Sequence, residues 1–516
     1  MANPLLFRSL LRDAPLANAS NQQGAAAFAF TPRHKLAQMV MTGCMNETFY
    51  ASGQAQLNDV LATAKDLDDL FLAQLAIYGR ERGMMKDMPA LLTAILAARG
   101  SALLPVVFTR VINNGRMLRN FVQMLRSGVT GRRSLGTRPK KLVQRWLQNA
   151  SEERLLQASV GNAPSLADIV KMVHPRPQAA WQEAFFAWLI GKPCDKAQLP
   201  EKTRALLAFR EGDMGAALPD VSFLLLTNAP LSREQWAQLA QRMSWQTLRM
   251  NLNTLARHDV FENATLAASV AQRLADRAQV RQSWVYPYQL LSAWSNLQSG
   301  VPQVIREALA QAEYALENIP PFRGNVVVCP DVSGSMKSSI TGYRKGETSK
   351  IRCVDVAGLI AAAVLRNHPQ ARVLPFECDV VDVRLDARQS VMHNAQKLAA
   401  VGGGGTNCSA PLRRLLNERA RVDLVIMVSD NESWVDKSRH GSTATMECWI
   451  ELKKRNPQAR LVCIDLLPYG TTQAAERSDI LNVGGFSDEV FTVIDNFVNG
   501  HYGSAHWLEE IEAVTL

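Results

Sequence analysis

The chain of 516 residues is long enough for two to four domains of about 100–200 residues each. Its composition, 47% hydrophobic and 20% charged residues, is that of a folded globular protein and excludes a disordered or collagen-like chain. No run of about 18 apolar residues occurs, so we expect no transmembrane helix and no membrane partner, and the N-terminal residues lack a secretory signal pattern. The eight cysteines stand singly, which predicts reduced thiols in a cytoplasmic protein.

The net charge of +10 comes entirely from the first three-fifths of the chain. Residues 1–320 hold 35 basic and 24 acidic residues, whereas residues 321–516 hold 22 and 23. No acidic residue occurs between Asp87 and Glu152, a stretch with eleven basic residues, nine of them arginine. Such a stretch attracts a polyanion, and arginine can clamp phosphates and stack on bases. We predict a nucleic-acid surface here; the alternative is a solvated helical face whose acidic partners come from elsewhere in the fold.

The first part of the chain is predicted to be helical. Residues 1–25 are small and polar, and we expect a loosely held N-terminal tail. From residue 26 to 320, apolar residues recur at helical spacing between short breaks with Gly, Pro, Asn or Ser. The clearest helical segments are residues 67–81, 88–98, 103–113 and 232–244. Helical hairpins at irregular periods of about 40 residues indicate a HEAT-like array; periodicity alone also fits an irregular helical domain.

The pattern changes at residue 320, after a predicted linker at residues 319–324. Short apolar runs rich in β-branched residues now alternate with helical segments. The strands are expected at residues 325–330, 371–377, 423–430 and 459–466, and the main helices at 353–367 and 410–420. This alternation predicts a doubly wound parallel sheet with helices on both faces. Ligands of such sheets bind beyond the carboxyl ends of the strands, near a topological switch point.

Small oxygen donors follow three of these segments. Asp331, Ser333 and Ser335 come directly after the first strand, Thr406 stands in a glycine-rich loop, and Asp430 ends a later strand. A hard divalent cation such as Mg²⁺ takes carboxylate and hydroxyl oxygens of this kind. The five residues therefore predict a cation site. The alternative is that each residue has a separate structural role, in a turn, at a helix cap or in a hydrogen bond within a loop.

This arrangement resembles the metal-ion-dependent adhesion site of von Willebrand factor A domains. Joined to a basic helical array, it resembles the Ro 60 kDa family, whose helical part is called the TROVE domain. The segments that carry the likeness are DIVKMVHPRP (168–177), MSWQTLRMNLNTLA (243–256), WVYPYQLLSAW (284–294), NVVVCPDVSGSM (325–336), GGGGTNCSAP (402–411) and VSDNES (428–433). The likeness covers about residues 26–500.

The resemblance implies a fold and a function. A HEAT-like helical toroid would span residues 26–320 and a von Willebrand A domain residues 321–516, the single chain closing into a monomeric ring. Ro proteins bind small noncoding Y RNAs and single-stranded 3′ ends of structured or misfolded RNAs, and bacterial members work with an exoribonuclease. We therefore expect an RNA-binding scaffold without catalysis, with Mg²⁺ at the adhesion site.

Some residues differ from the family pattern, so we expect the RNA contacts at other basic residues of this chain. Gln157 and Gly161 stand where a lysine and an arginine are expected, and residues 46–51 read NETFYA in place of GGTYYA. His174 matches a histidine implicated in RNA contact; otherwise it is a helix-end residue before a proline. The expected RNA-binding residues are Arg116, Arg119, Arg132, Arg133, Arg138, Lys140, Lys141, Lys171, His174 and Arg176.

Two other functions compete with the RNA scaffold. In a protein-adhesion scaffold, the A domain would grip a partner's acidic residue through Mg²⁺ and the helices would form a second protein surface. A metal-dependent nuclease is disfavoured, because such enzymes group several carboxylates around two metals and this site has two carboxylates. The chain also lacks a P-loop and an HExxH helix.

Overall fold

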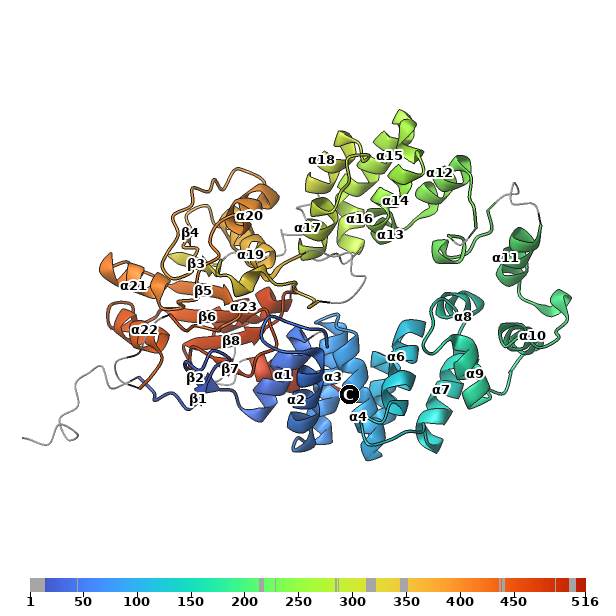
Figure 1. Ribbon diagram of the computed structural model, residues 1–516, viewed down its shortest axis with the longest axis horizontal. Coiled ribbons are helices and arrows are strands. Elements are labelled where there is room, and N and C mark those ends of the chain that lie inside the picture. The colour runs from blue at the N-terminus through green and yellow to red at the C-terminus, as the bar shows by residue number, and fades with distance from the viewer. Residues whose placement is uncertain are drawn as a thin grey trace, which may run out of the picture. The chain divides into compact units, whose positions relative to one another are not determined.

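The computed structural model describes residues 14–43, 45–212, 218–227, 229–283, 285, 287–311, 322–343, 351–435, 438, 441–487, 489–500 and 507–516. The chain forms two compact units, which are described separately (Figure 1). The sheet unit comprises the described residues of 1–67, 275–296 and 307–514. The helical unit comprises those of 68–274, 297–306 and 515–516.

A five-stranded parallel sheet forms the centre of the sheet unit, in the order β4-β3-β5-β6-β8. Its strands are β3 (Val326–Pro330), β4 (Arg372–Val373), β5 (Leu424–Ser429), β6 (Arg460–Asp465) and β8 (Ile480–Gly484). After β3 the chain adds β4 on one side and β5 on the other, so the switch point lies at β3 and β5. Every residue of β3, β5 and β8 is buried, which explains the nearly continuous apolar sequences of β3 and β5.

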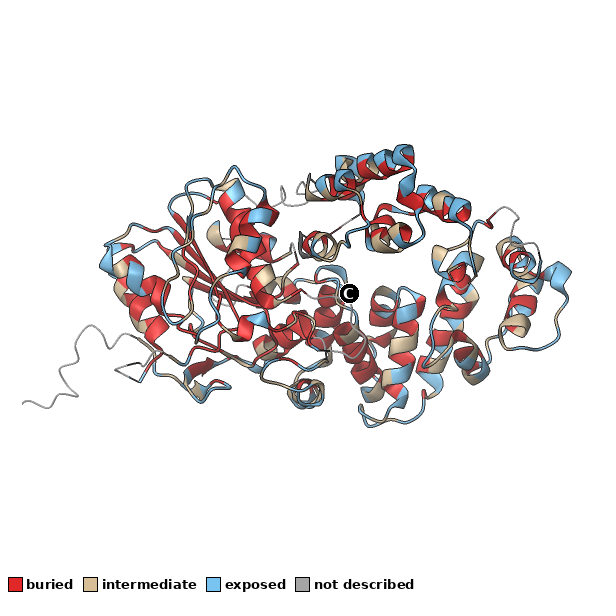
Figure 2. Cartoon of the chain, turned by 45° about the horizontal axis from the view of Figure 1, so that its top comes forward, coloured by how far each residue is buried: buried red, intermediate tan, exposed pale blue. Residues whose placement is uncertain are grey.

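Helices cover both faces of this sheet. Their bounds are α19 (Cys353–Asn367), α20 (Val391–Ala399), α21 (Ala410–Asn417), α22 (Ala444–Arg455), α23 (Glu489–Val498) and α24 (Trp507–Glu512). Val425 and Met427 of β5 share a core with Leu412 of α21 and Trp449 of α22. Because strand side chains alternate between the faces, Ile426 points to the opposite face. Figure 2 shows these strands buried between helices with exposed outer faces.

Two sequence expectations for the sheet need correction. The segment at 371–377 contains a strand of only two residues, Arg372–Val373. Beyond it, backbone N–H groups of Leu374 and Phe376 still donate to the carbonyl oxygens of Val328 and Pro330. The strand β8 was not expected, since its sequence ILNVG contains a polar residue and a glycine that weaken the strand signal. The predicted helix at 353–367 matches the structure at both ends.

The N-terminal residues belong to the sheet unit and not to a loose tail. The strands β1 (Ala19–Ser20), β2 (Ala26–Ala29) and β7 (Thr471–Thr472) form a small antiparallel sheet. Two helices follow, α1 (Pro32–Thr42) and α2 (Gly53–Lys65). The predicted boundaries at residues 25 and 320 thus differ from the division into units. Local composition predicts whether a segment forms a helix or a strand. It does not predict which unit the segment packs against, because that depends on residues far away in the chain. Residues 1–13 of the predicted tail and 319–321 of the predicted linker lie outside the described residues.

Paired helices make up the helical unit. In chain order they are α3 (Asp69–Glu81), α4 (Asp87–Arg99), α5 (Leu104–Val111), α6 (Gly115–Arg126), α7 (Thr137–Asn149), α8 (Glu152–Ala158), α9 (Leu166–Val173), α10 (Ala180–Leu189), α11 (Glu201–Glu211), α12 (Arg233–Arg242), α13 (Trp245–Met250), α14 (Leu252–Arg257) and α15 (Ala264–Ala275). The next two helices, α16 (Arg277–Gln282) and α17 (Pro287–Ser295), belong to the sheet unit, and α18 (Gln303–Gln311) crosses the division at residue 306. Serine, asparagine or aspartate side chains cap about half of the N-termini from α3 to α15, as at Asn114 and Ser165.

Two further expectations concern thiols and membranes. The seven described cysteines are free thiols, and five of them are buried. The burial of these five fits the prediction that most of the thiols are buried. Cys44 lies outside the described residues. Searching the described part of the chain for a helix with the length and apolarity of a membrane span gives none.

Candidate metal centre and nucleic-acid interface

The candidate metal centre lies where β3 and β5 end. These strands are parallel neighbours, so the residues that follow them meet at one edge of the sheet. The backbone N–H of Asp331 donates to the carbonyl oxygen of Val428, which continues the ladder by one residue. Asp331 and Asp430 are therefore held at adjacent positions by backbone pairing and not by flexible loops.

The structure brings all five predicted cation ligands together. The Ser333 N–H donates to Oδ1 of Asp331 at 2.8 Å, and the Ser333 and Ser335 hydroxyls lie 3.3 Å apart. The Thr406 hydroxyl donates to Ser333 Oγ at 3.0 Å, across 73 residues of sequence. The Asp430 carboxylate lies near the Ser335 side chain. All five side chains are buried, none more than 5% exposed.

Charge and hydrogen bonding at this edge fit a divalent cation. Asp430 Oδ2 is buried and has no hydrogen-bond partner among the described residues. Burial, then the charge of Asp430, raise the pKa of Asp331 to about 7, and burial raises the pKa of Asp430. Two buried carboxylates with an unpartnered oxygen are costly unless a positive charge or a proton compensates them. A cation with ligands from two carboxylates and three hydroxyls would supply that compensation.

Three further acidic or hydroxyl groups at this edge were missed by sequence analysis. The Ser429 hydroxyl donates to Asp331 Oδ2 at 2.6 Å. Glu432 is fully buried, and burial followed by the charge of Asp430 raises its pKa to about 8. Asp465 ends β6, and burial raises its pKa well above the ordinary value. The rule that acids at strand ends share an edge could have identified Asp465. Among the described residues no three His, Cys, Asp or Glu side chains are grouped to hold a metal.

The glycine-rich loop before Thr406 is close-packed against β3. Gly402 has a positive φ of 77°, and a Cβ there would lie 2.3 Å from the carbonyl oxygen of Val332. Only glycine fits both the conformation and the close approach. Gly334 donates its N–H to the carbonyl oxygen of Gly404 at 2.8 Å, which ties this loop to the DxSxS turn. The glycines thus bring Thr406 to the metal centre.

The predicted RNA-binding residues divide into two groups in the helical unit. In one group, the guanidinium groups of three arginines donate hydrogen bonds to backbone carbonyl oxygens. Arg119 donates to Ala158 O at 2.7 Å, Arg132 to Ala97 O at 3.0 Å, and Arg138 to Ser101 O at 2.9 Å. Burial, then the nearby charge of Arg116, lower the pKa of Arg119. These arginines close helix ends and loops, so part of the basic stretch is structural.

The other group of basic residues is free to meet a ligand. Among the described residues, no ion pair is formed by Arg116, Arg133, Lys140, Lys141 or Arg176. By contrast, Arg99 pairs with Asp69 at 3.0 Å and Arg110 with Glu81 at 2.6 Å. The alternative of a solvated helical face with acidic partners from elsewhere in the fold therefore applies to Arg99 and Arg110. It does not apply to the five basic residues that form no ion pair.

The histidine segment after α9 is fixed by α7. His174 is exposed and adopts a left-handed conformation with φ 50°, ending α9. Gln144 Nε2 donates to the carbonyl oxygen of Val173 at 2.6 Å, and Gln148 Nε2 donates to that of Arg176 at 2.8 Å. The segment with Lys171 and Arg176 is thus held beside α7, where Lys140 and Lys141 lie. Sequence analysis did not identify these two glutamines.

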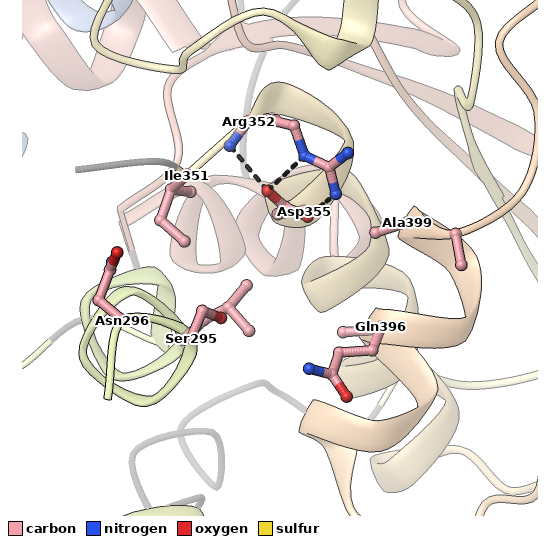
Figure 3. Close-up of a pocket in the computed structure, with 10 residues that line it drawn as sticks. Ser295, Asn296, Ile351, Arg352, Asp355, Gln396 and Ala399 are labelled. Atoms are coloured by element: carbon pink, nitrogen blue, oxygen red, sulfur yellow. Dashed lines mark hydrogen bonds and ion pairs between the residues drawn. The ribbon is translucent and has the colours of Figure 1, made fainter. Parts of the chain in front are cut away.

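A separate cavity of about 350 Å³ lies between α17, α19 and α20 in the sheet unit (Figure 3). Its charged groups are already paired: Arg352 binds Asp355 through two contacts of 2.7 and 3.0 Å. Ala395 and Ala399 supply small apolar walls. Because Arg352 and Asp355 are paired with each other, neither charge in this cavity is left for a ligand.

Two features define the class of the sheet unit. One is the parallel sheet, and the other is the group formed by the DxSxS turn, the glycine-rich loop with Thr406, and Asp430 at the end of β5. Residues 325–498 match the family model described as the Ro60 vWA domain, and they form a von Willebrand A domain of the Ro60 type. This match begins one residue before β3 and ends with α23.

Whole-chain comparisons extend the match to the helical unit. The chain is 24% identical over 522 aligned residues to the RNA-binding protein RO60 of Deinococcus radiodurans, covering 93% of this chain and 95% of that protein. The relative of the same name in Caenorhabditis elegans is 23% identical, covering 45% of this chain and 36% of that protein. A crystal structure of the D. radiodurans Ro protein matches with a TM-score of 0.61 and 22% identity, covering 92% of this chain and all of that one. The predicted resemblance to the Ro 60 kDa family is confirmed, as is the fold class of helices followed by a parallel-sheet A domain.

Proposed function

We propose that this protein is a scaffold that binds RNA through the basic surface of α6, α7 and α9. The observation that carries the proposal is the set of exposed or half-exposed basic side chains without acidic partners, within a stretch of 64 residues that has no acid. Cations that are not neutralised by the fold are available to phosphates. The RNA-binding relatives support the same function.

The RNA partners follow from the chemistry of this surface. Phosphate contacts carry little sequence information, so the surface recognises RNA by charge and shape, as suits a structured Y-like RNA and single-stranded 3′ ends. Partnership with an exoribonuclease, a single-chain ring and a cytoplasmic location belong to the same proposal. The proposed scaffold has no catalysis of its own: we expect pure protein with Mg²⁺ to leave labelled RNA intact, and cleavage that depends on Asp331 would contradict this.

We further propose that the A domain holds Mg²⁺ through Asp331, Ser333, Ser335, Thr406 and Asp430. The donor set is that of a hard cation, and the unpartnered Asp430 Oδ2 supports the assignment. The ion would neutralise carboxylates that the fold has buried together. This chain's own residues do the positioning, since backbone pairing fixes Asp331 and the Ser429 hydroxyl orients it.

The experiment that tests RNA binding starts from protein purified without nuclease. Co-purified RNA is sequenced and then titrated back at several salt concentrations. We expect enrichment of a small structured RNA, with affinity falling about 10³-fold between 50 and 200 mM salt if about six phosphates are contacted. Binding no tighter than to bulk transfer RNA, or clean protein with no enriched RNA, would overturn the proposal in favour of the protein-adhesion scaffold.

A further inference from the structure

The metal centre is covered by residues from the N-terminal end of the chain. Asn21 Nδ2 donates to the carbonyl oxygen of Ser433 at 2.7 Å, and the N–H of Gln22 donates to Oε2 of Glu432 at 2.8 Å. Both contacts reach the loop that carries Asp430, across more than 400 residues of sequence. Asn21 is itself buried, so this contact is part of the packed structure.

A second N-terminal stretch reaches the same edge from another side. Asn46 Nδ2 donates to the carbonyl oxygen of Thr341 at 2.8 Å, and the N–H of Tyr343 donates to that of Glu47 at 2.6 Å. The Tyr50 hydroxyl lies near the side chain of Ser335, a predicted cation ligand.

Tyr50 is held in this place by neighbours from both parts of the cover. Its backbone N–H donates to the hydroxyl of Tyr469 at 3.3 Å, and the two rings pack edge to face. The side chain of Gln23 also lies near the Tyr50 hydroxyl, which brings the two N-terminal stretches together. Burial, followed by the charge of Asp430, raises the pKa of Tyr50 to about 12, so the hydroxyl keeps its proton.

A site that receives an acid from another protein needs an open side. Here none of the five candidate ligands is more than 5% exposed, and Glu432 beside them is fully buried. The group that meets Ser335 from outside the A domain is the Tyr50 hydroxyl of the same chain. The Oε1 atom of Glu432 is also buried without a partner among the described residues, so a second carboxylate oxygen at this edge lacks compensation.

We infer that the cation site is an internal staple: a divalent cation at Asp331, Ser335 and Asp430 fixes residues 18–50 on the sheet edge through Tyr50 and Glu432, and the site does not receive the carboxylate of another protein. This inference rests on the cation site proposed above. Without the ion, Asp430 Oδ2 and Glu432 Oε1 lie buried beneath the cover with no hydrogen-bond partner among the described residues. With the ion bound, these oxygens are compensated and the Gln22–Glu432 hydrogen bond persists.

The test measures hydrogen exchange of the full chain in Mg²⁺ and in EDTA, with Mg²⁺ affinity measured by calorimetry on the same samples. We expect amides in residues 18–50 to exchange about tenfold more slowly in Mg²⁺, while amides of α3 in the helical unit do not change. Because coupling is reciprocal, Tyr50→Phe should lower both the protection and the Mg²⁺ affinity by a common factor of about 5–10. Tyr343→Phe removes a hydroxyl from an exposed side chain nearby and should change neither.

The outcomes separate the staple from the site on which it rests. Mg²⁺ binding with unchanged exchange in residues 18–50 overturns the staple and leaves the cation site standing. No Mg²⁺ binding at all overturns both, whereas RNA binding is decided by its own titration. Slower exchange in Mg²⁺ that persists in Tyr50→Phe and in Glu432→Gln also overturns the staple, because the protection would then come by another route.

Discussion

The helical unit and the sheet unit use charge in opposite ways. On α6, α7 and α9 and in the loop between α6 and α7, exposed or half-exposed basic side chains such as Lys141 and Arg133 are left without acidic partners. At the sheet edge, the carboxylates of Asp331, Asp430, Glu432 and Asp465 are buried together. Unpaired surface charge costs little and attracts a large, opposite partner, whereas unpaired buried charge is costly and requires a compensating ion or proton. The comparison teaches that the first arrangement suits a polyanion and the second a small cation.

The largest expected effect is at the cation site. Asp331→Asn should lower Mg²⁺ affinity at least about 100-fold, because it removes a ligand charge that no neighbour replaces. Calorimetry measures the affinity, and Asp382→Asn, at an exposed position, is the matched control. RNA affinity should be unchanged, since the basic surface is in the other unit. Retained Mg²⁺ affinity in Asp331→Asn would remove this residue from the site.

Charge reversal on the helical unit should give the next largest effect. Arg133→Glu with Lys141→Glu should weaken RNA binding about 10- to 100-fold and reduce the salt slope by about two, because two phosphate contacts are lost. The matched control is Arg384→Glu with Arg388→Glu, which makes the same change in net charge on the sheet unit; Arg388 is 96% exposed there. Equal loss in both double variants would mean that net charge, and not this surface, determines affinity.

The pH dependence of the metal-free protein should distinguish the buried acids from ordinary ones. The pKa values of Asp331, about 7, and Glu432, about 8, lie above the ordinary range in the folded protein. Their neutral forms are favoured by folding, so the stability they contribute is present at low pH and is lost as the pH rises through 7 and 8. In EDTA the unfolding temperature should fall over this window, and Mg²⁺ should raise it more at the upper end. A flat or rising profile in EDTA would contradict the assignment.

The smallest effect should separate structural from ligand-binding arginines. Arg138 donates to the carbonyl oxygens of Gly100, Ser101 and Ala102, which follow α4. Arg138→Ala should lower the stability of the helical unit by about 1 kcal/mol, because these carbonyls lose their donor. Arg133→Ala should leave the unfolding temperature unchanged and weaken RNA binding. Denaturant unfolding and RNA titration of both variants check the pair, and the reverse pattern would exchange their roles.

Much of the fold could be predicted because local patterns carry it. Helix α19 begins and ends where the apolar periodicity does, and the strands β3, β5 and β6 lie within the predicted apolar runs. The five candidate cation ligands also follow from sequence, since residues after parallel strands share one edge. The strand β8 could not be predicted, because a polar residue and a glycine hide its apolar pattern, and the early end of β4 at Val373 is visible only in the structure.

The departures at the basic surface needed the structure. Gly161 stands where an arginine was expected, yet the Arg119 guanidinium occupies that place from α6: a Cβ on Gly161 would lie 2.7 Å from its Nη2. An arginine can thus be supplied from a different helix, which a comparison of single positions cannot detect. The same holds for Gln144 and Gln148, which fix the segment at His174 from α7.

The sequence by itself determined the types of elements, their order and the excess of positive charge in the first part, and it identified the five residues that we propose as cation ligands. These are properties of neighbouring residues, and local periodicity and composition report them directly. Only the tertiary structure decided that residues 14–67 belong with the sheet. It also decided that Arg119, Arg132 and Arg138 donate hydrogen bonds to backbone carbonyl oxygens, and that Tyr50 lies near Ser335. These contacts join residues far apart in the chain, and they are selected by burial and charge compensation in the folded state, which no short window of sequence contains.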